Sequence, residues 1–363
     1  MARIVGFFPR LDLAMQPRHL ALTLAVALAA CGAPPPDSGT PAPAVPVQAA
    51  PAPAPDAVAD AAFGTLSAKA LDAWMRLSPV SATQTGDHRF DTALDDLSAA
   101  GRKDALDANR ALLAELSAIP TGKLSRENQV DAAILRNALE SSLWNSEVMQ
   151  DWAWNPQVYN DLAGGAIYGL MAREFAPLPE RIAAATARME KIPALFAQAR
   201  ENLDPARVPK IHAETVAKQN RGILSIVATF ITPHLGELHG EQAERTRAAI
   251  AGLEKAVAEH QQWLEGTLVP NAQGDFRIGA EKYDQKLKFA LSSSLSRAEI
   301  RQRAEAEMKR VRETMYGIAQ SVLKDRPGAP EMPAQPTTEQ QQAAIEAALE
   351  LAYADHPARD AVV

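Results

Sequence analysis

Apolar residues recur at helical spacing along most of this 363-residue chain. Val130, Ile134 and Ala138 are four apart, which places them on one face of a helix that Ser125 is expected to cap. The same spacing predicts helices near residues 58–77, 99–118, 159–175, 180–202, 209–232 and 241–265. No stretch combines sustained alternation with β-branched residues, as the strands of a half-buried sheet do. The pattern predicts an all-α fold, a multi-helix array with short connections.

Capping residues and prolines predict where several helices begin and end. Ser296 with Glu299 forms a capping box that opens a helix reaching about Lys324, and Thr337 with Gln340 opens a helix reaching about Tyr353. Pro193 predicts a kink within 180–202. Breaks between helices are expected at seven further prolines, at positions 79, 120, 156, 177, 179, 205 and 270.

The chain begins with the features of a lipoprotein export signal. Its only cysteine follows Leu28-Ala29-Ala30, and the apolar run before it, 20–30, has 11 residues, whereas a membrane span needs about 20. We therefore expect a signal peptide over 1–30, starting at Met1 or Met15, and a lipid on Cys31. Because Gly32 rather than aspartate follows the cysteine, the expected destination is the outer membrane, facing the periplasm.

Composition changes sharply after the cysteine. Residues 31–57 are mostly alanine and proline, which favour extended polyproline II and predict a semi-rigid tether. A helical domain is expected over 58–363. Without residues 1–30 the chain carries 34 basic and 43 acidic residues, a net charge of −9. This balance argues against nucleic acid as a partner and leaves the lipid anchor as the contact with the membrane.

Motifs that would reveal catalysis are missing from the sequence. It contains no HExxH, no Gly-x-Ser-x-Gly, no phosphate-binding loop and no cysteine beyond Cys31. His234 and His239 are five residues apart, with Pro233 and Gly236 breaking the helix there, so the pair suits helix ends better than zinc. We expect this chain by itself to contain no catalytic residues, no metal site and no cofactor.

The densest polar cluster is Gly86-Asp87-His88-Arg89-Phe90-Asp91. The side chains of Asp87, His88, Arg89 and Asp91 could hold a peptide terminus. They could equally form a buried polar lock between helices, with Arg89 paired to an aspartate, and this alternative is favoured because paired charges are common structural features.

Four aromatic residues surround Asn155-Pro156: Trp144, Trp152, Trp154 and Tyr159. Such a group can line a groove for an apolar side chain. More often it forms core beneath a loop, which is the favoured interpretation here.

Together these segments resemble bacterial lipoproteins catalogued as domain of unknown function 885. The resemblance rests on ordered matches along the chain: 85–91 with Leu94 and 97–98, Trp154-Asn155-Pro156, 188–203, 278–284 with Leu287, and 305–308. It runs from about residue 60 to the end of the chain.

The resemblance implies a relationship to gluzincin metallopeptidases, which are all-α enzymes with a deep cleft and a zinc ion held by HExxH and a downstream glutamate. In the family the zinc helix lies in the C-terminal half. The resemblance therefore implies the N-terminal half of an envelope-anchored, zinc-dependent peptidase-like lipoprotein, truncated before the zinc-binding half and inactive as given. Its expected partners are the membrane, a peptide substrate and the missing half. The alternative is a non-catalytic helical lipoprotein that binds a ligand or protein partner.

Half of a larger fold should present apolar helix faces without a cover. The candidates are 338–353 and the segment 223–231, which is apolar on most sides.

Overall fold

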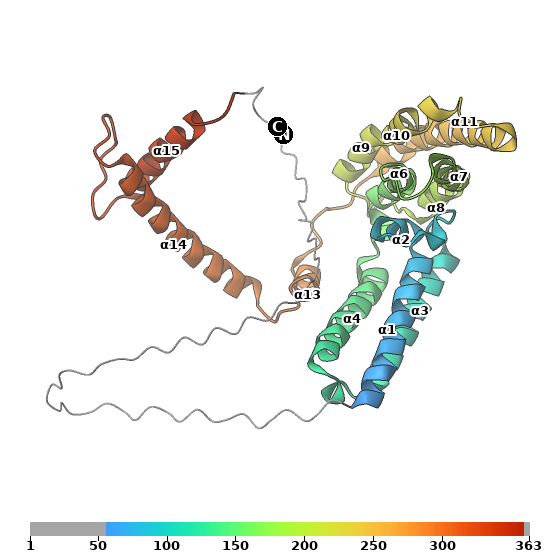
Figure 1. The fold of residues 1–363 in the computed structure, drawn as a ribbon, viewed down its shortest axis with the longest axis horizontal. Coiled ribbons are helices and arrows are strands. Elements are labelled where there is room, and N and C mark those ends of the chain that lie inside the picture. Colours follow the sequence, from blue (N-terminus) through green and yellow to red (C-terminus); the bar gives the residue numbers. More distant parts are fainter. Residues whose placement is uncertain (1–55, 359–363) are drawn as a thin grey trace, which may run out of the picture. The chain divides into compact units, whose positions relative to one another are not determined.

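The computed structural model describes residues 56–358 as helices joined by short loops (Figure 1). The α-helices are α1 (Ala57–Leu77), α2 (Pro79–Thr85), α3 (Ala99–Ala118), α4 (Arg126–Trp144), α5 (Asp151–Trp154), α6 (Gln157–Met171), α7 (Leu178–Met189), α8 (Ile192–Asn202), α9 (Lys210–Gln219), α10 (Gly222–Phe230), α11 (Gly240–Trp263), α12 (Val269–Asn271), α13 (Ala280–Leu291), α14 (Arg297–Leu323) and α15 (Thr338–Ala354). In the described part, β-structure is limited to one isolated bridge between Pro209 and Gly274. The predicted all-α array is confirmed.

The expected signal peptide, Cys31 and nearly all of the tether lie outside the described residues. Over residues 56–358, no helix combines the length and the apolar character that crossing a bilayer would need.

The predicted helix starts are confirmed where a side chain caps the first turn. The Ser98 hydroxyl accepts from the backbone N–H of Gly101 at 3.1 Å, and that of Ser125 accepts from Asn128 at 3.3 Å. Both predicted capping boxes, at Ser296 and Thr337, are complete. Each cap satisfies donors that the first turn of a helix leaves without a partner.

Two segments predicted as single helices are each divided into two. The segment 180–202 forms α7 and α8, and Pro193 is the second residue of α8 rather than a kink, a position where its missing N–H costs no hydrogen bond. The segment 209–232 is divided at Asn220, which is fully buried. Its amide donates to Val257 O at 3.1 Å and to Gln261 at 3.0 Å, so contacts with α11 fix the turn between α9 and α10.

Four further α-helices were not predicted, and two of them, α5 and α12, are very short. Pro79, a predicted break, is the first residue of α2, where proline's fixed φ suits a helix start. Helix α13 follows Gly279, whose φ of +84° lies in the region that favours glycine.

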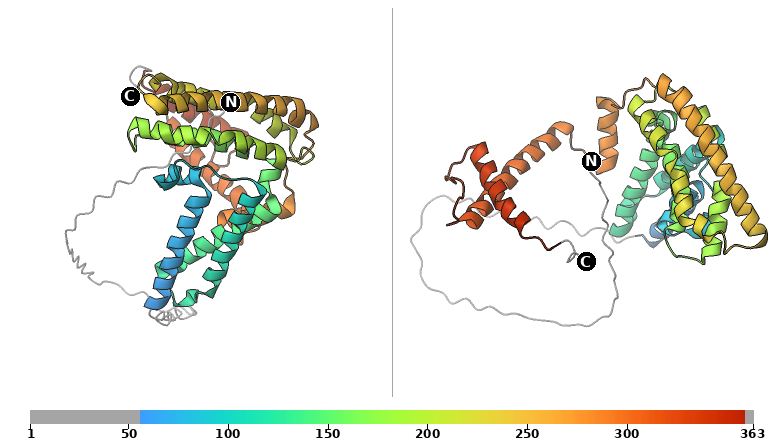
Figure 2. Two further views of the ribbon diagram at one scale, coloured as in Figure 1. Left: turned by 90° about the vertical axis from the view of Figure 1, so that its right-hand side faces the viewer. Right: turned by 90° about the horizontal axis from the view of Figure 1, so that it is seen from above.

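Buried side chains form three clusters. Phe63, Leu112 and Leu139 belong to the cluster that joins α1, α3 and α4, which lie alongside one another in Figure 1. The largest cluster contains buried residues from each of the helices α6 through α11, among them Ile167. The third lies between α14 and α15, the neighbouring helices near the red end of the colour scale in Figure 2.

The expectation that 223–231 presents an uncovered apolar face is wrong. Ile223, Val227 and Ile231 are buried in the largest cluster, and the other apolar residues of this segment, Leu224, Ile226 and Phe230, pack against it partly buried. A helix apolar on most sides is here buried on most sides. The other candidate, α15, buries Ala344 and Ile345 but leaves Tyr353 63% exposed.

His260 of α11 is a titratable group inside the largest cluster. Its ring is stacked 4.2 Å from the Phe196 ring and 5.4 Å from the Trp263 ring, measured between centroids. The side chain is 2% exposed, and its Nδ1 has no hydrogen-bond partner in the described structure. Desolvation, aided by the positive charge of Arg200, lowers the pKa of His260 to about 3. The ring is therefore neutral in the folded protein.

This burial predicts a stability loss in acid. In the unfolded chain His260 binds a proton below the ordinary histidine pKa of 6.5, whereas in the folded chain it binds one only below about pH 3. The free energy of unfolding therefore falls as pH falls from about 6.5 to about 3. At pH 5 the loss amounts to roughly 2 kcal/mol. We expect His260→Phe, which retains a stacked ring, to reduce the difference between urea unfolding free energies at pH 7 and pH 5 by about that amount. The exposed control His239→Gln should retain the wild-type difference, and equal differences in both variants would contradict this.

Candidate functional site

The predicted polar cluster is built around a turn at the end of α2. Gly86 ends the helix with a φ of +95°, and the Asp87 carboxylate then accepts from the backbone N–H of Arg89 at 3.1 Å. Residues 88–90 form a short 3-10 turn. This turn divides the four polar side chains into an outward pair and an inward pair.

The outward pair is Asp87 and Arg89. Arg89 donates to Asp87 through Nη2 at 2.7 Å and to Asp72 of α1 through Nη1 at 2.6 Å. The Arg89 guanidinium lowers the pKa of Asp87. Because water screens this exposed ion pair, it fixes the local conformation more than it stabilises the fold.

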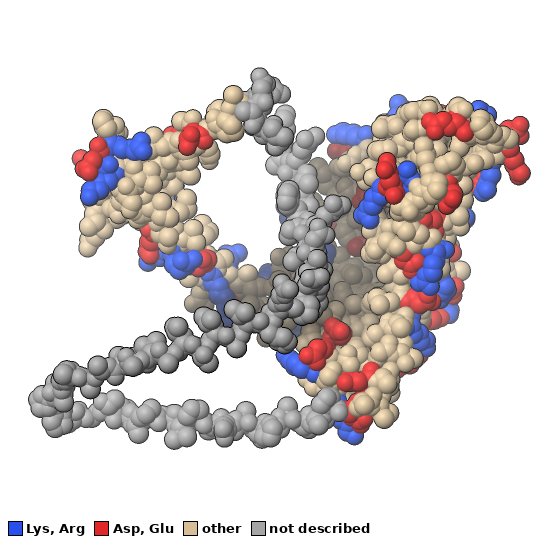
Figure 3. Space-filling view, in the orientation of Figure 1, with Lys and Arg blue, Asp and Glu red and all other residues tan. Residues whose placement is uncertain are grey.

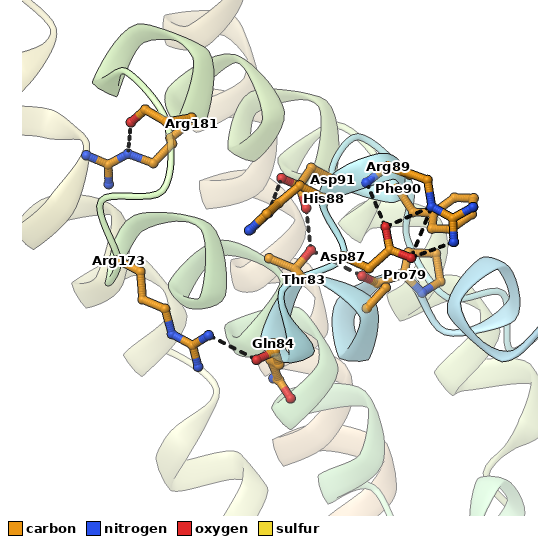
Figure 4. A network of polar contacts seen from close by, with 12 residues as sticks. Pro79, Thr83, Gln84, Asp87, His88, Arg89, Phe90, Asp91, Arg173 and Arg181 are labelled. Atoms are coloured by element: carbon orange, nitrogen blue, oxygen red, sulfur yellow. Dashed lines mark hydrogen bonds and ion pairs between the residues drawn. The ribbon is translucent and has the colours of Figure 1, made fainter. Parts of the chain in front are cut away.

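The inward pair is His88 and Asp91, shown in Figure 4. Asp91 accepts from the Thr83 hydroxyl at 2.6 Å, and its other oxygen is 2.9 Å from His88 Nδ1. The His88 ring is stacked on Phe175 with centroids 3.6 Å apart. All four side chains thus make polar contacts within the protein, as in the lock interpretation, but the Arg89 ion pair is exposed rather than buried.

The group that connects this cluster to the rest of the fold is Arg188 of α7, a residue that sequence reasoning did not select as a site residue. It is fully buried. Its Nη2 donates to Thr83 Oγ1 at 2.7 Å and to Pro79 O at 2.9 Å. Its Nε donates to Ala93 O at 2.8 Å and its Nη1 to Ala166 O at 3.1 Å. One guanidinium therefore joins α2, the segment after the turn, α6 and α7.

The charge of Arg188 is balanced at a distance. Burial lowers the pKa of Arg188, while the nearby Asp91 and Asp95 carboxylates oppose that shift. Burial raises the pKa of Asp95. That shift is opposed by the Val80 N–H, which donates to the carboxylate at 3.1 Å, and by the positive charge of Arg188. The buried link between these helices is therefore the Arg188 cation with two acidic neighbours, and we call this arrangement the Arg188 lock.

Asp95 also lines a cavity of about 550 Å³. The walls come from the end of α1, the segment 94–97, α3, and the region from the end of α4 to the start of α5. Arg102 of α3 donates to Leu97 O and to the Asn202 side chain, both at 2.6 Å. These bonds hold the segment that forms one wall.

A second cavity, of about 420 Å³, adjoins the first and shares Ser142, Ser146 and Trp152 with it. Its other lining residues are Asn137, Ala138, Ser141, Asn145 and Asp151. The lining consists almost wholly of hydroxyl, amide, carboxylate and indole groups. We call the two cavities together the α3–α4 groove.

The four predicted aromatic residues have different surroundings. Tyr159 is fully buried and its hydroxyl donates to Trp152 O at 2.7 Å, and Trp144 is 6% exposed beside Phe289. Trp154 is half-buried and its ring is stacked against that of His212. Trp152 lines both cavities of the groove. Core packing thus accounts for two of the four, and one lines a groove.

The histidines do not form a metal site in the described part of the chain. His234 Nδ1 lies 2.8 Å from Glu237, an exposed contact at the helix end. Over residues 56–358 no three histidine, cysteine, aspartate or glutamate side chains gather at a distance that could hold a metal ion.

Lysine, arginine and acidic side chains are interspersed over the face seen in Figure 3, with no large patch of one sign there.

Comparison with known proteins assigns the chain to a family. The family model described as "Bacterial protein of unknown function (DUF885)" matches residues 79–361. The chain belongs to the DUF885 family. The match begins at α2, so it contains the polar turn, Arg188 and most of the groove.

A solved structure resembles this DUF885 chain. It is described as a "putative lipoprotein of unknown function" from Shewanella oneidensis, with 27% sequence identity and a TM-score of 0.70. The similarity covers 82% of this chain and 54% of the Shewanella chain, so this chain spans about half the length of that relative. No curated protein matches the sequence at a significant level.

The buried arginine generates a stability prediction. Arg188→Leu removes donors from two buried and two partly buried carbonyl groups, and we expect the free energy of unfolding to fall by about 3–5 kcal/mol. Arg173→Leu is the matched control, because Arg173 is exposed and donates to a single carbonyl, Gln84 O, at 3.0 Å (Figure 4). Urea unfolding followed by circular dichroism measures both. Equal stability of the two variants would show that Arg188 does not hold the helices together.

Proposed function

We propose that this chain is the N-terminal part of an envelope-anchored, peptidase-like DUF885 lipoprotein. Three observations support the proposal: the lipobox before Cys31, the family match over 79–361, and a relative that is itself described as a lipoprotein. In this proposal Cys31 carries the lipid, residues 31–57 hold the helices away from the membrane, and the protein faces the periplasm from the outer membrane.

The observation that carries the proposal is an exposed apolar stripe on α14. Its members recur at alternating intervals of three and four residues, and they are Met308, Val311, Met315, Ile318 and Val322, exposed by 68%, 39%, 37%, 58% and 40%. This spacing forms one continuous seam along a helix, as in helices that pack against a partner. The neighbouring face of α14, with Tyr316, Ala319 and Leu323, is covered by α15.

A seam of this kind indicates a polypeptide surface that packs against the stripe. Exposed contiguous apolar surface marks an interaction site or a risk of aggregation. The part of the Shewanella chain that this chain does not span, close to half of it, is the natural source of such a cover in a family member.

The zinc site of the proposed peptidase does not belong to the described helices. A hydrolytic zinc needs three protein ligands and a bound water, and the residues of 56–358 bring no such ligand set together. The proposal therefore assigns zinc and catalysis to the portion of a family member that corresponds to the rest of the Shewanella chain. The helices described here would then contribute substrate contacts and support.

A second candidate, a non-catalytic lipoprotein that binds a ligand, is favoured by the α3–α4 groove. Each cavity of the groove has a volume in the range of about 300–1,000 Å³ that is usual for small-molecule sites. The two cavities share three lining residues, Ser142, Ser146 and Trp152.

The anchor is tested by lipid labelling. Labelled palmitate should enter the wild-type protein and not Cys31→Ala, because the thiol is the attachment point and the chain has no second cysteine. The variant should also leave the membrane fraction. Equal labelling of both proteins would exclude Cys31 as the lipid site.

The proposed role as part of a larger unit is tested on untagged residues 31–363. We expect binding of a dye for apolar surface and self-association, both reduced in Met308→Glu/Ile318→Glu, together with no stoichiometric zinc and no peptide hydrolysis. Glu305→Gln/Glu313→Gln, on the same exposed helix, is the control and should behave as wild type. One tightly held zinc per chain, or a wild-type monomer that binds no dye, would overturn the proposal.

A further inference from the structure

The α3–α4 groove contains a preorganised set of polar groups at its centre. Asn109 of α3 is 6% exposed. Its Oδ1 accepts from Trp74 Nε1 at 3.0 Å, and its Nδ2 donates to Ser142 Oγ at 2.9 Å. Because Ser142 Oγ accepts the Asn109 bond, its own proton remains available to a ligand in the groove.

Trp152 forms the wall common to both cavities. The Arg102 guanidinium lies over its indole ring, 3.8 Å from the centroid, and two carbonyl acceptors hold the same arginine through Nη1. The indole is thus fixed in position by a cation on a ring face that attracts positive charge. A fixed aromatic wall costs a ligand no ordering of the protein.

Asp151 is the group that the fold leaves without a partner. It is the first residue of α5 and lines the second cavity. Its Oδ1 is inaccessible to solvent and accepts no hydrogen bond in the described structure. Burial raises the pKa of Asp151, and the charge of Lys286 opposes that shift. Only the part of the Asp151 side chain that lines the second cavity can therefore meet a ligand, as an acceptor for O–H or N–H groups.

We propose that the α3–α4 groove binds an oligosaccharide. Sugar hydroxyls both donate and accept, which matches a lining of carboxylate, amide and hydroxyl groups around Asp151 and Ser142. The positively polarised C–H groups of a pyranose ring suit the negative face of an indole such as Trp152. Two adjoining cavities of about 550 and 420 Å³ offer room for consecutive sugar units.

A peptide fits the groove less well. Extended peptides gain affinity by adding a strand to a sheet edge, and residues 56–358 form no strand that could supply one. Helical peptides need a continuous apolar trough. The first cavity has apolar walls such as Leu94 and Leu97, but the second is lined almost entirely by polar side chains and does not continue them.

This inference is independent of the peptidase proposal. It uses only groups within the helices described here, so zinc analysis and sugar binding can succeed or fail separately.

The first experiment uses wild-type residues 31–363 labelled with ¹⁵N. The indole N–H signals of the five tryptophans are followed during titration with tetra-N-acetylchitotetraose, with cellotetraose and, as the peptide comparison, with tetra-alanine. We expect saturable shifts of the Trp74 and Trp152 signals with a tetrasaccharide and none for Trp263, which lies by His260 in the largest cluster. If neither tetrasaccharide shifts these two signals, or if tetra-alanine shifts them equally, the proposal is overturned.

The second experiment compares two aspartate variants by isothermal titration calorimetry. Asp151→Ala should weaken binding of the tetrasaccharide at least about tenfold, a change of about 1.4 kcal/mol, because the ligand loses a carboxylate that lines the second cavity. The variant should fold at least as stably as wild type, since the lost carboxylate has an unpartnered oxygen. Asp131→Ala, an exposed carboxylate on α4 that does not line the groove, should bind as wild type. Equal binding by both variants would place the ligand elsewhere and overturn the site.

Discussion

The buried guanidinium of Arg188 is the interaction on which the described fold most depends. It donates to carbonyl oxygens from α2, from α6 and from the segment at Ala93, three pieces of chain that lie 22 to 109 residues from it in sequence. A buried cation is tolerated only when its donors are satisfied and negative charge lies near, and Asp91 and Asp95 supply that charge. Apolar packing alone would hold these helices in several registers, because it is non-directional. The fork of one arginine selects a single arrangement.

This constraint explains why charged residues are dense just after α2. The turn from Gly86 to Asp91 must place the Thr83 hydroxyl and the carbonyl oxygens of Phe90 and Ala93 around the Arg188 side chain of α7. The outward pair, Asp87 and Arg89, then fixes the turn against α1. The same arrangement positions Asp95, whose carboxylate accepts from Val80 and borders the groove. The groove wall is therefore a consequence of the lock rather than an independent element.

The local features of this fold could be predicted from sequence, but the long-range ones could not. The helix starts at Ser98, Ser125, Ser296 and Thr337 follow from side chains three residues from their targets. The break at Asn220 depends on atoms of α11, some 40 residues away, and no local pattern signals it. Arg188 carried one usable signal, an arginine that follows the run of small residues from Ala183 to Ala187 in α7. An arginine there must be paired inside or reach solvent, and sequence alone does not say which.

The groove was beyond sequence reasoning for a related reason. Its central residues, Asn109, Ser142 and Asp151, lie on three helices, and none belongs to a motif. In a sequence, polar side chains such as these predict only the solvent-facing side of each helix. That they lie close together can be seen only in the packed structure.

The groove and the α14 stripe leave different physical requirements unmet. The polar side chains that line the groove, Ser142 and Asp151 among them, need hydrogen-bond partners, which water or a hydroxyl-bearing ligand can supply but an apolar surface cannot. Met308 and Ile318 lack apolar cover, which only another protein surface or a lipid can supply. A polar ligand would leave the α14 stripe uncovered, and an apolar surface would leave the polar groups of the groove without partners. The two proposed occupants, a small polar ligand between α3 and α4 and a polypeptide along α14, therefore answer separate physical requirements.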